Sequence, residues 1–334
     1  MSIQQGNLEP QTPPSAARSL LSGNFWGRFG VPLALLAIVL LFTAASDRFL
    51  TGDNVINIFR QGAVVAIAAV GATLVLIVAG IDISQGAIMA LAAVTTVVGV
   101  QDFGLPDGVA IIIGLVLAAV VGLVNGLLAE YIRIPAFIAT LGTALVVRGI
   151  AFVYTEGRSI GFGRGEEVSG EFVQWLGKGF IGPIPVPVVF MILLYILAGL
   201  VMRRTLWGLH TYAIGSAERA ARVAGLRVQR HRIQVYMLAG LLSGLAGVVL
   251  AGRLGSASPS IGVGAEFDIL TAVVLGGTSI YGGRGNVERT LLGALFLSTL
   301  TNGLIILNVP TFYQQIAVGV VLLLALTLDR LQSR

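Results

Sequence analysis

The 334-residue sequence contains no cysteine, two histidines and a single lysine, Lys178. Without cysteine the chain cannot form disulfides, bind a metal through thiolates or use a cysteine nucleophile. The two histidines, His210 and His231, both lie in an arginine-rich segment, and the apolar segments show no nucleophile–base spacing. These absences argue against an intramembrane enzyme, and we expect no catalytic site, no cofactor and no metal in this chain.

Charged residues are also scarce, at 11% of the chain, against about 25% in an ordinary soluble domain. The hydrophobic share is 56% and the mean hydropathy is +0.91. Apolar stretches of membrane length, or close to it, predict about ten transmembrane segments, at residues 31–46, 60–79, 84–100, 109–129, 136–154, 185–202, 233–252, 267–281, 290–307 and 312–328. The short eighth segment suits a half-spanning helix. The expected fold is therefore all-α, a polytopic bundle of membrane helices.

The arginines predict how the chain is oriented. Arg18 and Arg28 precede the first span, and residues 203–232 contain seven arginines with Glu218 as the only acid. The positive-inside rule places both regions in the cytoplasm, and an even number of spans returns Arg330 and the C-terminus to the same side. The pI near 10.0 is then a consequence of topology, and we expect no nucleic-acid partner.

Three segments lie outside the predicted membrane domain, which covers residues 31–334. Residues 1–30 are polar and contain three prolines, so they are expected to form a disordered cytoplasmic tail ahead of a retained membrane anchor. Residues 155–184 fall on the external side by alternation and have the glycine content of an ordered but irregular loop. Residues 203–232 form the cytoplasmic loop.

A charged break with a glycine at each end lies between the second and third apolar segments. Residues 80–86 read Gly-Ile-Asp-Ile-Ser-Gln-Gly. Lipid offers the backbone no hydrogen-bond partners, so such a break survives only where protein or water covers it, and an ionisable residue there marks a candidate functional site. Asp82, Ser84 and Gln85 suit the hydroxyl groups of a substrate. The alternative is that Asp82 or Ser84 only caps the helix beginning near Gly86.

A weak internal repeat predicts two related halves with interrupted helices. Residues 78–86 align with residues 275–283, each an apolar run followed by two glycines six residues apart. The pairs Asn125-Gly126 and Asn302-Gly303 also correspond. Transporters built from repeats place interrupted segments near the substrate path. Both asparagines could line that path, and interhelical packing through a hydrogen bond is the alternative.

The cytoplasmic loop predicts a short helix over residues 216–225. Ser216 is the expected N-cap and Gly225 the expected C-terminal stop. The helix carries alanines and almost no large apolar residues, which favours docking to a protein over insertion among lipid headgroups. A Walker A loop is not found, because Gly282-Gly283-Arg284 lacks the lysine and hydroxyl that such a loop requires. The chain should therefore not hydrolyse ATP itself.

Several motifs occur in order along the chain: the break at residues 80–86, the run Arg-Ile-Pro-Ala-Phe-Ile-Ala-Thr-Leu-Gly at 133–142, Arg148-Gly149, residues 208–226, residues 272–279, and Gly-Gly-x-Gly at 282–285. Together they resemble the permease subunits of ribose-type bacterial sugar ABC importers. The resemblance runs from about residue 46 to the end. Gln85, where the family more often has a small or apolar residue, and the outer loop at 156–182 depart from the pattern.

The resemblance implies a set of partners. These are a second permease subunit in a homo- or heterodimer, two cytoplasmic nucleotide-binding domains that hydrolyse ATP, and a periplasmic sugar-binding protein, in the lipid of the bacterial inner membrane. It also implies two sets of residues. Coupling to the ATPase would use Ser216, Glu218, Ala220, Arg222, Gly225 and Leu226. The translocation path would use Gly80, Asp82, Ser84, Gln85, Asn125, Phe137, Thr140, Gly277, Thr278, Ser279 and Asn302. The alternative function is an ion-coupled secondary transporter with Asp82 as the coupling carboxylate.

Overall fold

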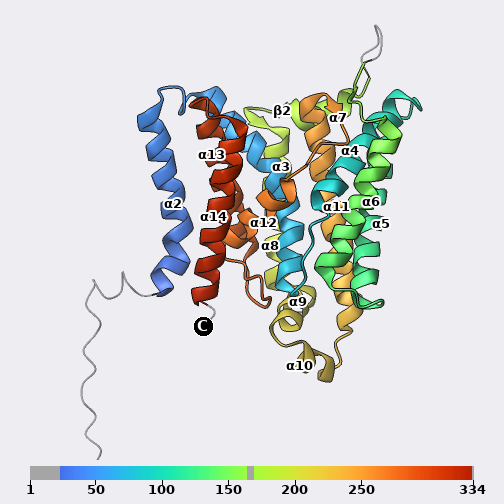
Figure 1. The fold of residues 1–334 in the computed structure, drawn as a ribbon, viewed down its shortest axis with the longest axis vertical. Helices are drawn as coiled ribbons and strands as arrows, with labels where there is room; N and C mark the ends of the chain where they lie inside the picture. The colour runs from blue at the N-terminus through green and yellow to red at the C-terminus, as the bar shows by residue number, and fades with distance from the viewer. Residues whose placement is uncertain (1–22, 164–168, 333–334) are drawn as a thin grey trace, which may run out of the picture.

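The computed structural model describes residues 23–163 and 169–332, which are mainly helical (Figure 1). Ten helices overlap the ten predicted segments: α2 (Gly23–Ala45), α3 (Gly52–Ile77), α4 (Gln85–Gln101), α5 (Asp107–Glu130), α6 (Ala136–Thr155), α8 (Val186–Arg204), α11 (Val228–Leu254), α12 (Ala265–Leu275), α13 (Val287–Ile306) and α14 (Thr311–Gln332). Seven of them, α3, α5, α6, α8, α11, α13 and α14, are long and apolar enough to cross a membrane. The prediction of an all-α membrane bundle is confirmed.

Several predicted boundaries are wrong, among them the start of the first span and the end of the eighth. Helix α2 begins at Gly23, so residues 23–30 belong to the first helix and not to the predicted tail, whose remainder lies outside the described residues. Helix α12 has 11 residues and ends at Leu275, where Gly276 and Gly277 stop it. At 1.5 Å per residue it is about 16 Å long, roughly half of a bilayer core. The eighth segment is a half-length helix.

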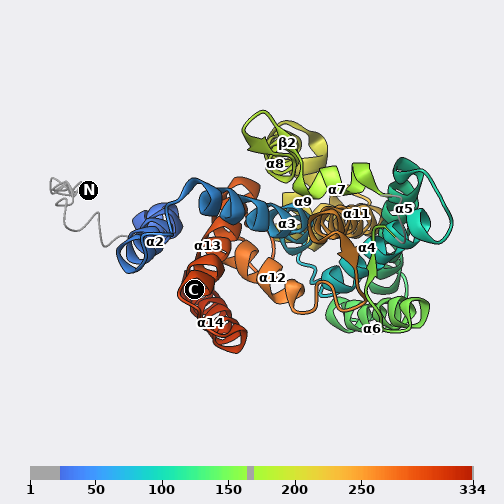
Figure 2. The ribbon, with the colours of Figure 1, turned by 90° about the horizontal axis from the view of Figure 1, so that it is seen from above.

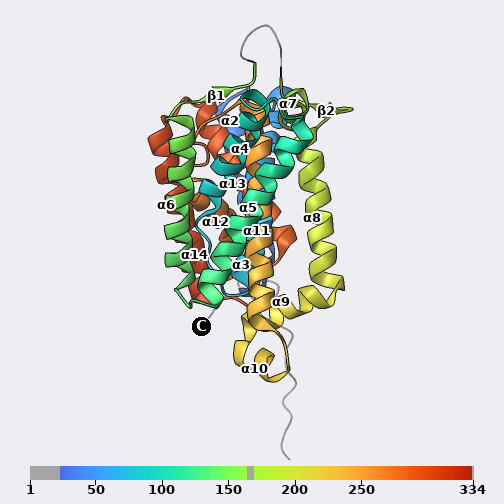
Figure 3. The ribbon, with the colours of Figure 1, turned by 90° about the vertical axis from the view of Figure 1, so that its right-hand side faces the viewer.

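The two ends of the bundle carry different structures. Helices α9 (Leu206–Ser216) and α10 (Glu218–Val223) form one end, together with the start of α2 and the end of α14 (Figure 1). Helix α7 (Glu171–Lys178) lies at the opposite end (Figure 3). This arrangement agrees with the predicted topology, in which the arginine-rich loop and both termini share one side.

The segment predicted as an irregular external loop contains regular structure. Val173 and Leu176, three residues apart, are buried on one face of α7, and Gly177 packs against the backbone of Gly252 and Arg253 in α11. Strand β1 (Ile160–Gly161) pairs antiparallel with β4 (Ser256–Ala257), and β2 (Phe180–Ile181) pairs with β3 (Ile184–Pro185). The glycine content of this segment predicted an irregular loop, but the segment contains an amphipathic helix that packs against α11.

Helix α11 lies at the centre of the larger part of the bundle, among α3, α4, α5 and α7 (Figure 2). Small residues allow this close packing: a Cβ added at Gly71 would lie 2.7 Å from the Cα of Ala239, and one added at Gly126 would lie 2.9 Å from the Cα of Ile233. Close backbone approach through small residues is typical of membrane helices. Helix α11 therefore holds the ends of α3 and α5 in fixed positions.

Candidate functional site

Helix α3 ends in a backbone cap that starts the charged break. Ala79 has a φ of 59°, and the N–H groups of Ala79 and Gly80 donate to the carbonyl oxygens of Leu76 and Val75, both at 2.9 Å. This is the Schellman arrangement, here with an alanine in the left-handed position that glycine usually occupies. A Cβ on Gly80 would lie 2.6 Å from the Tyr236 hydroxyl, so only glycine fits at position 80 beside Tyr236.

Helix α12 ends with the same cap. Gly277 has a φ of 86°, and the N–H groups of Gly277 and Thr278 donate to the carbonyl oxygens of Val274 and Val273, at 2.8 and 3.2 Å. The local structures therefore align Ala79 with Gly277. The sequence repeat, which relies on the glycine spacing, aligns Gly80 with Gly277 and is thus shifted by one residue. The structure thus has two interrupted helices, and each break begins in the same way.

The two breaks meet beside α9. The Gly283 N–H donates to the carbonyl oxygen of Ile77, the last residue of α3, at 2.8 Å. The Tyr212 hydroxyl of α9 donates to the carbonyl oxygen of Gly285 at 3.0 Å. Both contacts join the second break to the end of the bundle that carries α9 and α10. A movement of α9 would therefore displace the second break, and through its hydrogen bond to Ile77 also the start of the first break.

A buried chain of hydrogen bonds connects the first break to α5 and α6. Asp82 Oδ1 accepts from the backbone N–H of Ser84 at 2.8 Å and from its hydroxyl at 2.6 Å. Asn125 Nδ2 of α5 donates to Ser84 Oγ at 2.8 Å, and the Thr143 hydroxyl of α6 donates to Asn125 Oδ1 at 2.5 Å. The Thr140 hydroxyl accepts from the Ile83 N–H at 3.3 Å. The predicted residues of this region are thus brought together.

Thr143 belongs to this chain of hydrogen bonds but is not among the predicted path residues. It lies three residues after Thr140, which places both hydroxyls on one face of α6. That spacing was the available signal. It went unused because single threonines in an apolar segment usually donate to their own helix, and the hydroxyl of Thr143 is in fact also 3.0 Å from the Thr140 carbonyl oxygen.

The capping alternative for the break is wrong in its simple form. Ser84 is the N-cap residue of α4, but its side chain accepts no hydrogen bond from an α4 amide. Asp82 accepts from the N–H of Ser84, ahead of the helix, in the manner of an Asx turn. Asp82 Oδ2 and Gln85 Nε2 are buried and have no hydrogen-bond partner. Such atoms in a native fold call for an explanation, and a ligand or water is one.

The side chains of four other predicted path residues, Phe137, Thr278, Ser279 and Asn302, take no part in this chain of hydrogen bonds. Thr278 is fully buried with its hydroxyl unpartnered, and Ser279 Oγ lies 3.4 Å from Asp329 Oδ2 of α14. Phe137, in the first turn of α6, is about half exposed. Asn302 and Asn54 exchange two amide hydrogen bonds of 2.9 Å near the start of α3. That is about 37 Å along α3 from the break, so Asn302 fits the packing alternative.

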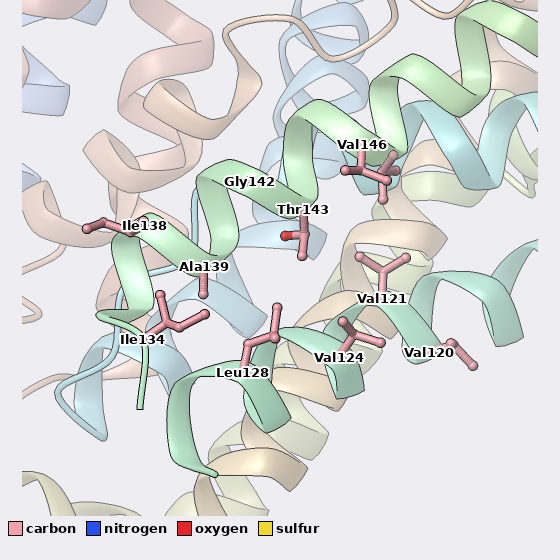
Figure 4. Close-up of a pocket in the computed structure, with 11 residues that line it drawn as sticks. Val120, Val121, Val124, Leu128, Ile134, Ile138, Ala139, Gly142, Thr143 and Val146 are labelled. Atoms are coloured by element: carbon pink, nitrogen blue, oxygen red, sulfur yellow. The ribbon is translucent and has the colours of Figure 1, made fainter. Parts of the chain in front are cut away.

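A groove of about 560 Å³ lies between α5 and α6 (Figure 4). It is lined by Val120, Val121, Val124, Leu128, Ile134, Ile138, Ala139, Gly142, Thr143, Val146 and Val147. Thr143 carries the one hydroxyl among these residues. An apolar groove of this kind gives the hydroxyl groups of a sugar almost no partners. We therefore assign the candidate path to the polar break and not to this groove.

The short helix of the arginine-rich loop differs from its prediction at one end. Helix α10 begins at Glu218, and Ser216 is the last residue of α9, where its hydroxyl donates to the Tyr212 carbonyl oxygen at 2.8 Å. The N-cap prediction for Ser216 is wrong because α9 continues through it. The predicted C-terminal stop is confirmed: Gly225 has a φ of 87°, and its N–H donates to the Arg222 carbonyl oxygen at 3.0 Å.

The six predicted coupling residues lie in α10 or within two or three residues of its ends. Ser216, Ala220, Arg222 and Gly225 are exposed, whereas Glu218 and Leu226 are partly buried. Val223 in the last turn of α10 is 89% exposed, and a groove of about 280 Å³ beside it is lined by Gly225, Leu226, Arg227, Arg230, His210, Ile214, His231 and Gln234. An exposed apolar residue next to a basic groove is a suitable surface for a partner protein.

Glu218 is held in its charged form. Its Oε1 lies 2.8 Å from Arg222 Nη2, and its Oε2 lies 2.9 Å from Arg232 Nη2. The hydrogen bond from Arg222 lowers the pKa of Glu218 below its ordinary 4.5. A lowered pKa means that this contribution to the folded state is complete above about pH 4.5 and is lost as the pH falls through the lowered value. The ion pairs of α10 are therefore intact at neutral pH.

Comparison with known proteins decides the family. The model of the family described as branched-chain amino acid transport system / permease component matches residues 54–326. The chain belongs to this permease family. The ribose import permease protein RbsC of Bacillus subtilis is 42% identical over 306 residues, which are 92% of this chain and 94% of that protein. The RbsC protein of Escherichia coli K12 is 41% identical, over 89% and 92% of the two chains. The D-allose transport system permease protein AlsC of the same strain is 36% identical, over 93% and 94%.

These matches confirm the resemblance to ribose-type permeases and the expectation of a transport subunit. The permease is a multi-pass membrane protein, and membership in the family implies association with an ATPase and a substrate-binding protein. The matches also favour the importer over the ion-coupled transporter that would use Asp82. They do not test individual site residues of the permease, whose roles stay predictions.

Gly225 gives a direct test of the α10 cap in the permease. Replacing it with valine should reduce solute uptake about tenfold, because a left-handed β-branched residue is strained by about 1–2 kcal/mol and the cap would open. Gly225→Asn should keep most of the uptake, since asparagine tolerates this conformation. No atom lies within 4 Å of the added Cβ, so any loss reflects backbone strain rather than a clash. Uptake is compared at equal amounts of protein in the membrane. Equal uptake by both variants would contradict a role for the cap.

Proposed function

We propose that this permease forms the translocation path of an ATP-driven importer for a monosaccharide or a similar small polar solute. The observation that carries the proposal is 42% identity to a ribose import permease over nearly the whole of both chains. The solute would be delivered by a periplasmic binding protein, and a second permease subunit, identical or different, would complete the path. The end that carries α9 and α10 would face the cytoplasm, with both termini.

The buried polar break is the part of the bundle best suited to solute hydroxyls. Sugars need hydrogen-bond partners of both kinds along their route, and Asp82 Oδ2 is a free acceptor while Gln85 Nε2 is a free donor. Both atoms are covered in this structure. The break would therefore offer them to a solute only in a state in which α4, α5 and α6 have separated, as alternating access requires.

The partner ATPase would dock on α10 and the groove beside it. ATP binding and hydrolysis change the separation of two ATPase subunits, and a helix held by each subunit would follow. Work is transmitted only if the docked helix binds its partner differently in the two states. The exposed Val223 and Gly225 would supply the contact surface. The Tyr212 bond to Gly285 would pass the movement of α9 to the second break.

Affinity purification from the native membrane in mild detergent tests the assembly. The expected result is recovery of a soluble ATPase, and with it or separately a binding protein that can be screened against pentoses, hexoses and polyols. Gly225→Val should recover less ATPase than Gly225→Asn under the same conditions. A permease that purifies alone, and moves solute in liposomes under an ion gradient without ATP, would contradict the proposal.

Asp82 separates the proposed function from ion coupling. Asp82→Asn should retain most ATP-driven uptake, because the amide oxygen can accept the two hydrogen bonds that Ser84 now gives to Asp82. Asp82→Ala should lower uptake about tenfold or more, since a buried group left unpaired destabilises by about 1–3 kcal/mol. An ion-coupled transporter would lose activity equally with both substitutions. Uptake is measured in proteoliposomes with the ATPase and binding protein present.

A further inference from the structure

One arginine joins the predicted coupling helix to the charged break. Arg232, in the second turn of α11, is 15% exposed and makes three contacts. Its Nη2 lies 2.9 Å from Glu218 Oε2, its Nη1 donates to Glu130 Oε1 at 3.2 Å, and its Nε donates to the carbonyl oxygen of Val78 at 3.2 Å. All three edges of the guanidinium are therefore used.

The three acceptors belong to three different parts of the bundle. Glu218 is the first residue of α10, Glu130 is the last residue of α5, and Val78 is the C-cap of α3, directly before the left-handed Ala79. A cation at the C-terminus of α3 is also favoured by the helix dipole. The guanidinium thus connects α10 directly to the start of the break.

Helix α11 contacts the break a second time, one turn further along. The Tyr236 hydroxyl donates to the carbonyl oxygen of Ile81 at 3.3 Å, and Tyr236 is four residues after Arg232 on the same face. Helix α11 therefore forms hydrogen bonds with the break at two carbonyl oxygens, those of Val78 and Ile81. Only the residue that contacts Val78, Arg232, also contacts α10.

The chemistry of the contact requires arginine. A guanidinium presents five N–H donors in a fixed plane and can serve three separate acceptors at once, whereas a lysine ammonium is a single point charge on a flexible stem. Removing one partner of a largely buried ion pair leaves the other charge uncompensated. The geometry of α10 and the geometry of the break therefore depend on each other through one side chain.

We propose that Arg232 is a positioning residue that transmits the displacement of α10 to the charged break. This inference rests on the proposed function, in which the ATPase docks on α10. When α10 moves with the ATPase, Glu218 shifts the guanidinium of Arg232. The hydrogen bond from Arg232 to the Val78 carbonyl oxygen then changes. The break then shifts relative to Tyr236, which stays fixed on α11. Loss of the link uncouples ATP hydrolysis from solute movement.

The test uses the permease reconstituted in proteoliposomes with its ATPase and binding protein, and measures solute moved per ATP hydrolysed. Arg232→Lys and Glu218→Gln should each lower this ratio by about tenfold, within the usual range of coupling between sites. In Arg232→Lys, which leaves the surface of α10 unchanged, hydrolysis should stay within about twofold. The double variant should be no worse than either single one, because both remove the same link. Glu288→Gln is the control: it breaks an exposed ion pair of 2.9 Å between α13 and Arg203 of α8, which is not part of the Arg232 link.

Two results would overturn the inference. One is an unchanged ratio in Arg232→Lys. The other is a parallel fall of hydrolysis and uptake in Arg232→Lys, which would reduce Arg232 to a docking or folding role. Failure of the unaltered complex to move solute with ATP would instead contradict the proposed function, so the two failures are distinguishable. The amount of each variant in the membrane and its bound ATPase are measured in the same samples.

Discussion

Uptake should fall at least about tenfold when Asn125 is replaced by alanine. The substitution removes the fully buried amide that links Ser84 to Thr143, and each of the two hydroxyl groups loses one hydrogen bond. Each lost bond destabilises by about 0.5–1.5 kcal/mol. Because the bonds of Asn125 join α5 and α6 to the break, the lost stability falls on the region that we expect to open during transport.

Asn302 provides the matched control for this prediction. It is also a buried asparagine followed by glycine, and its amide pairs with Asn54 far from the break. Asn302→Ala should lower the melting temperature of the permease but leave initial uptake within about twofold at equal protein in the membrane. Equal losses of uptake in Asn125→Ala and Asn302→Ala would contradict the assignment of the path to the polar break.

The second large effect is expected at Gly215. A Cβ at this position would overlap the carbonyl oxygen of Ile77 and lie 2.7 Å from the backbone nitrogen of Gly283. Both atoms are backbone and take part in the hydrogen bond that joins the two breaks, so neither can move without separating them. Gly215→Val should therefore abolish uptake while hydrolysis by the partner ATPase continues.

Gly319 in α14 is the control for Gly215. A Cβ there has no atom within 4 Å, so Gly319→Val tests the general effect of adding valine to a helix of this bundle. It should leave uptake near the level of the unaltered permease. Normal uptake by Gly215→Val would show that contact between α9 and the two breaks is not needed for transport.

The sequence predicted the membrane helices well because length and hydropathy alone specify them. It was less accurate wherever a boundary depended on packing. Helix α7 was missed because its buried face, formed by Val173, Leu176 and Gly177, is recognisable only once α11 is beside it. The N-cap at Ser216 was wrong because a serine at a helix end can also bond backward to its own helix, as its bond to Tyr212 shows.

The candidate site could be predicted only in part. The break was recognisable because a charged residue between glycines is costly in a membrane, and the local fold there is indeed irregular. The partners of the break were harder to find, because contacts between helices far apart in sequence leave no local pattern. Asn125 and Asn302 have the same neighbour in sequence, yet one lies at the break and the other pairs with Asn54. Arg232 counted in the sequence only as a sign of topology.

The most direct test of the account is uptake of a labelled monosaccharide into proteoliposomes that contain the permease, its ATPase and its binding protein. The account predicts accumulation that requires ATP, requires both partners, and persists when ion gradients are collapsed with ionophores. Accumulation by the permease alone, driven by a proton or sodium gradient and lost in Asp82→Asn, would contradict the account and assign Asp82 to ion coupling.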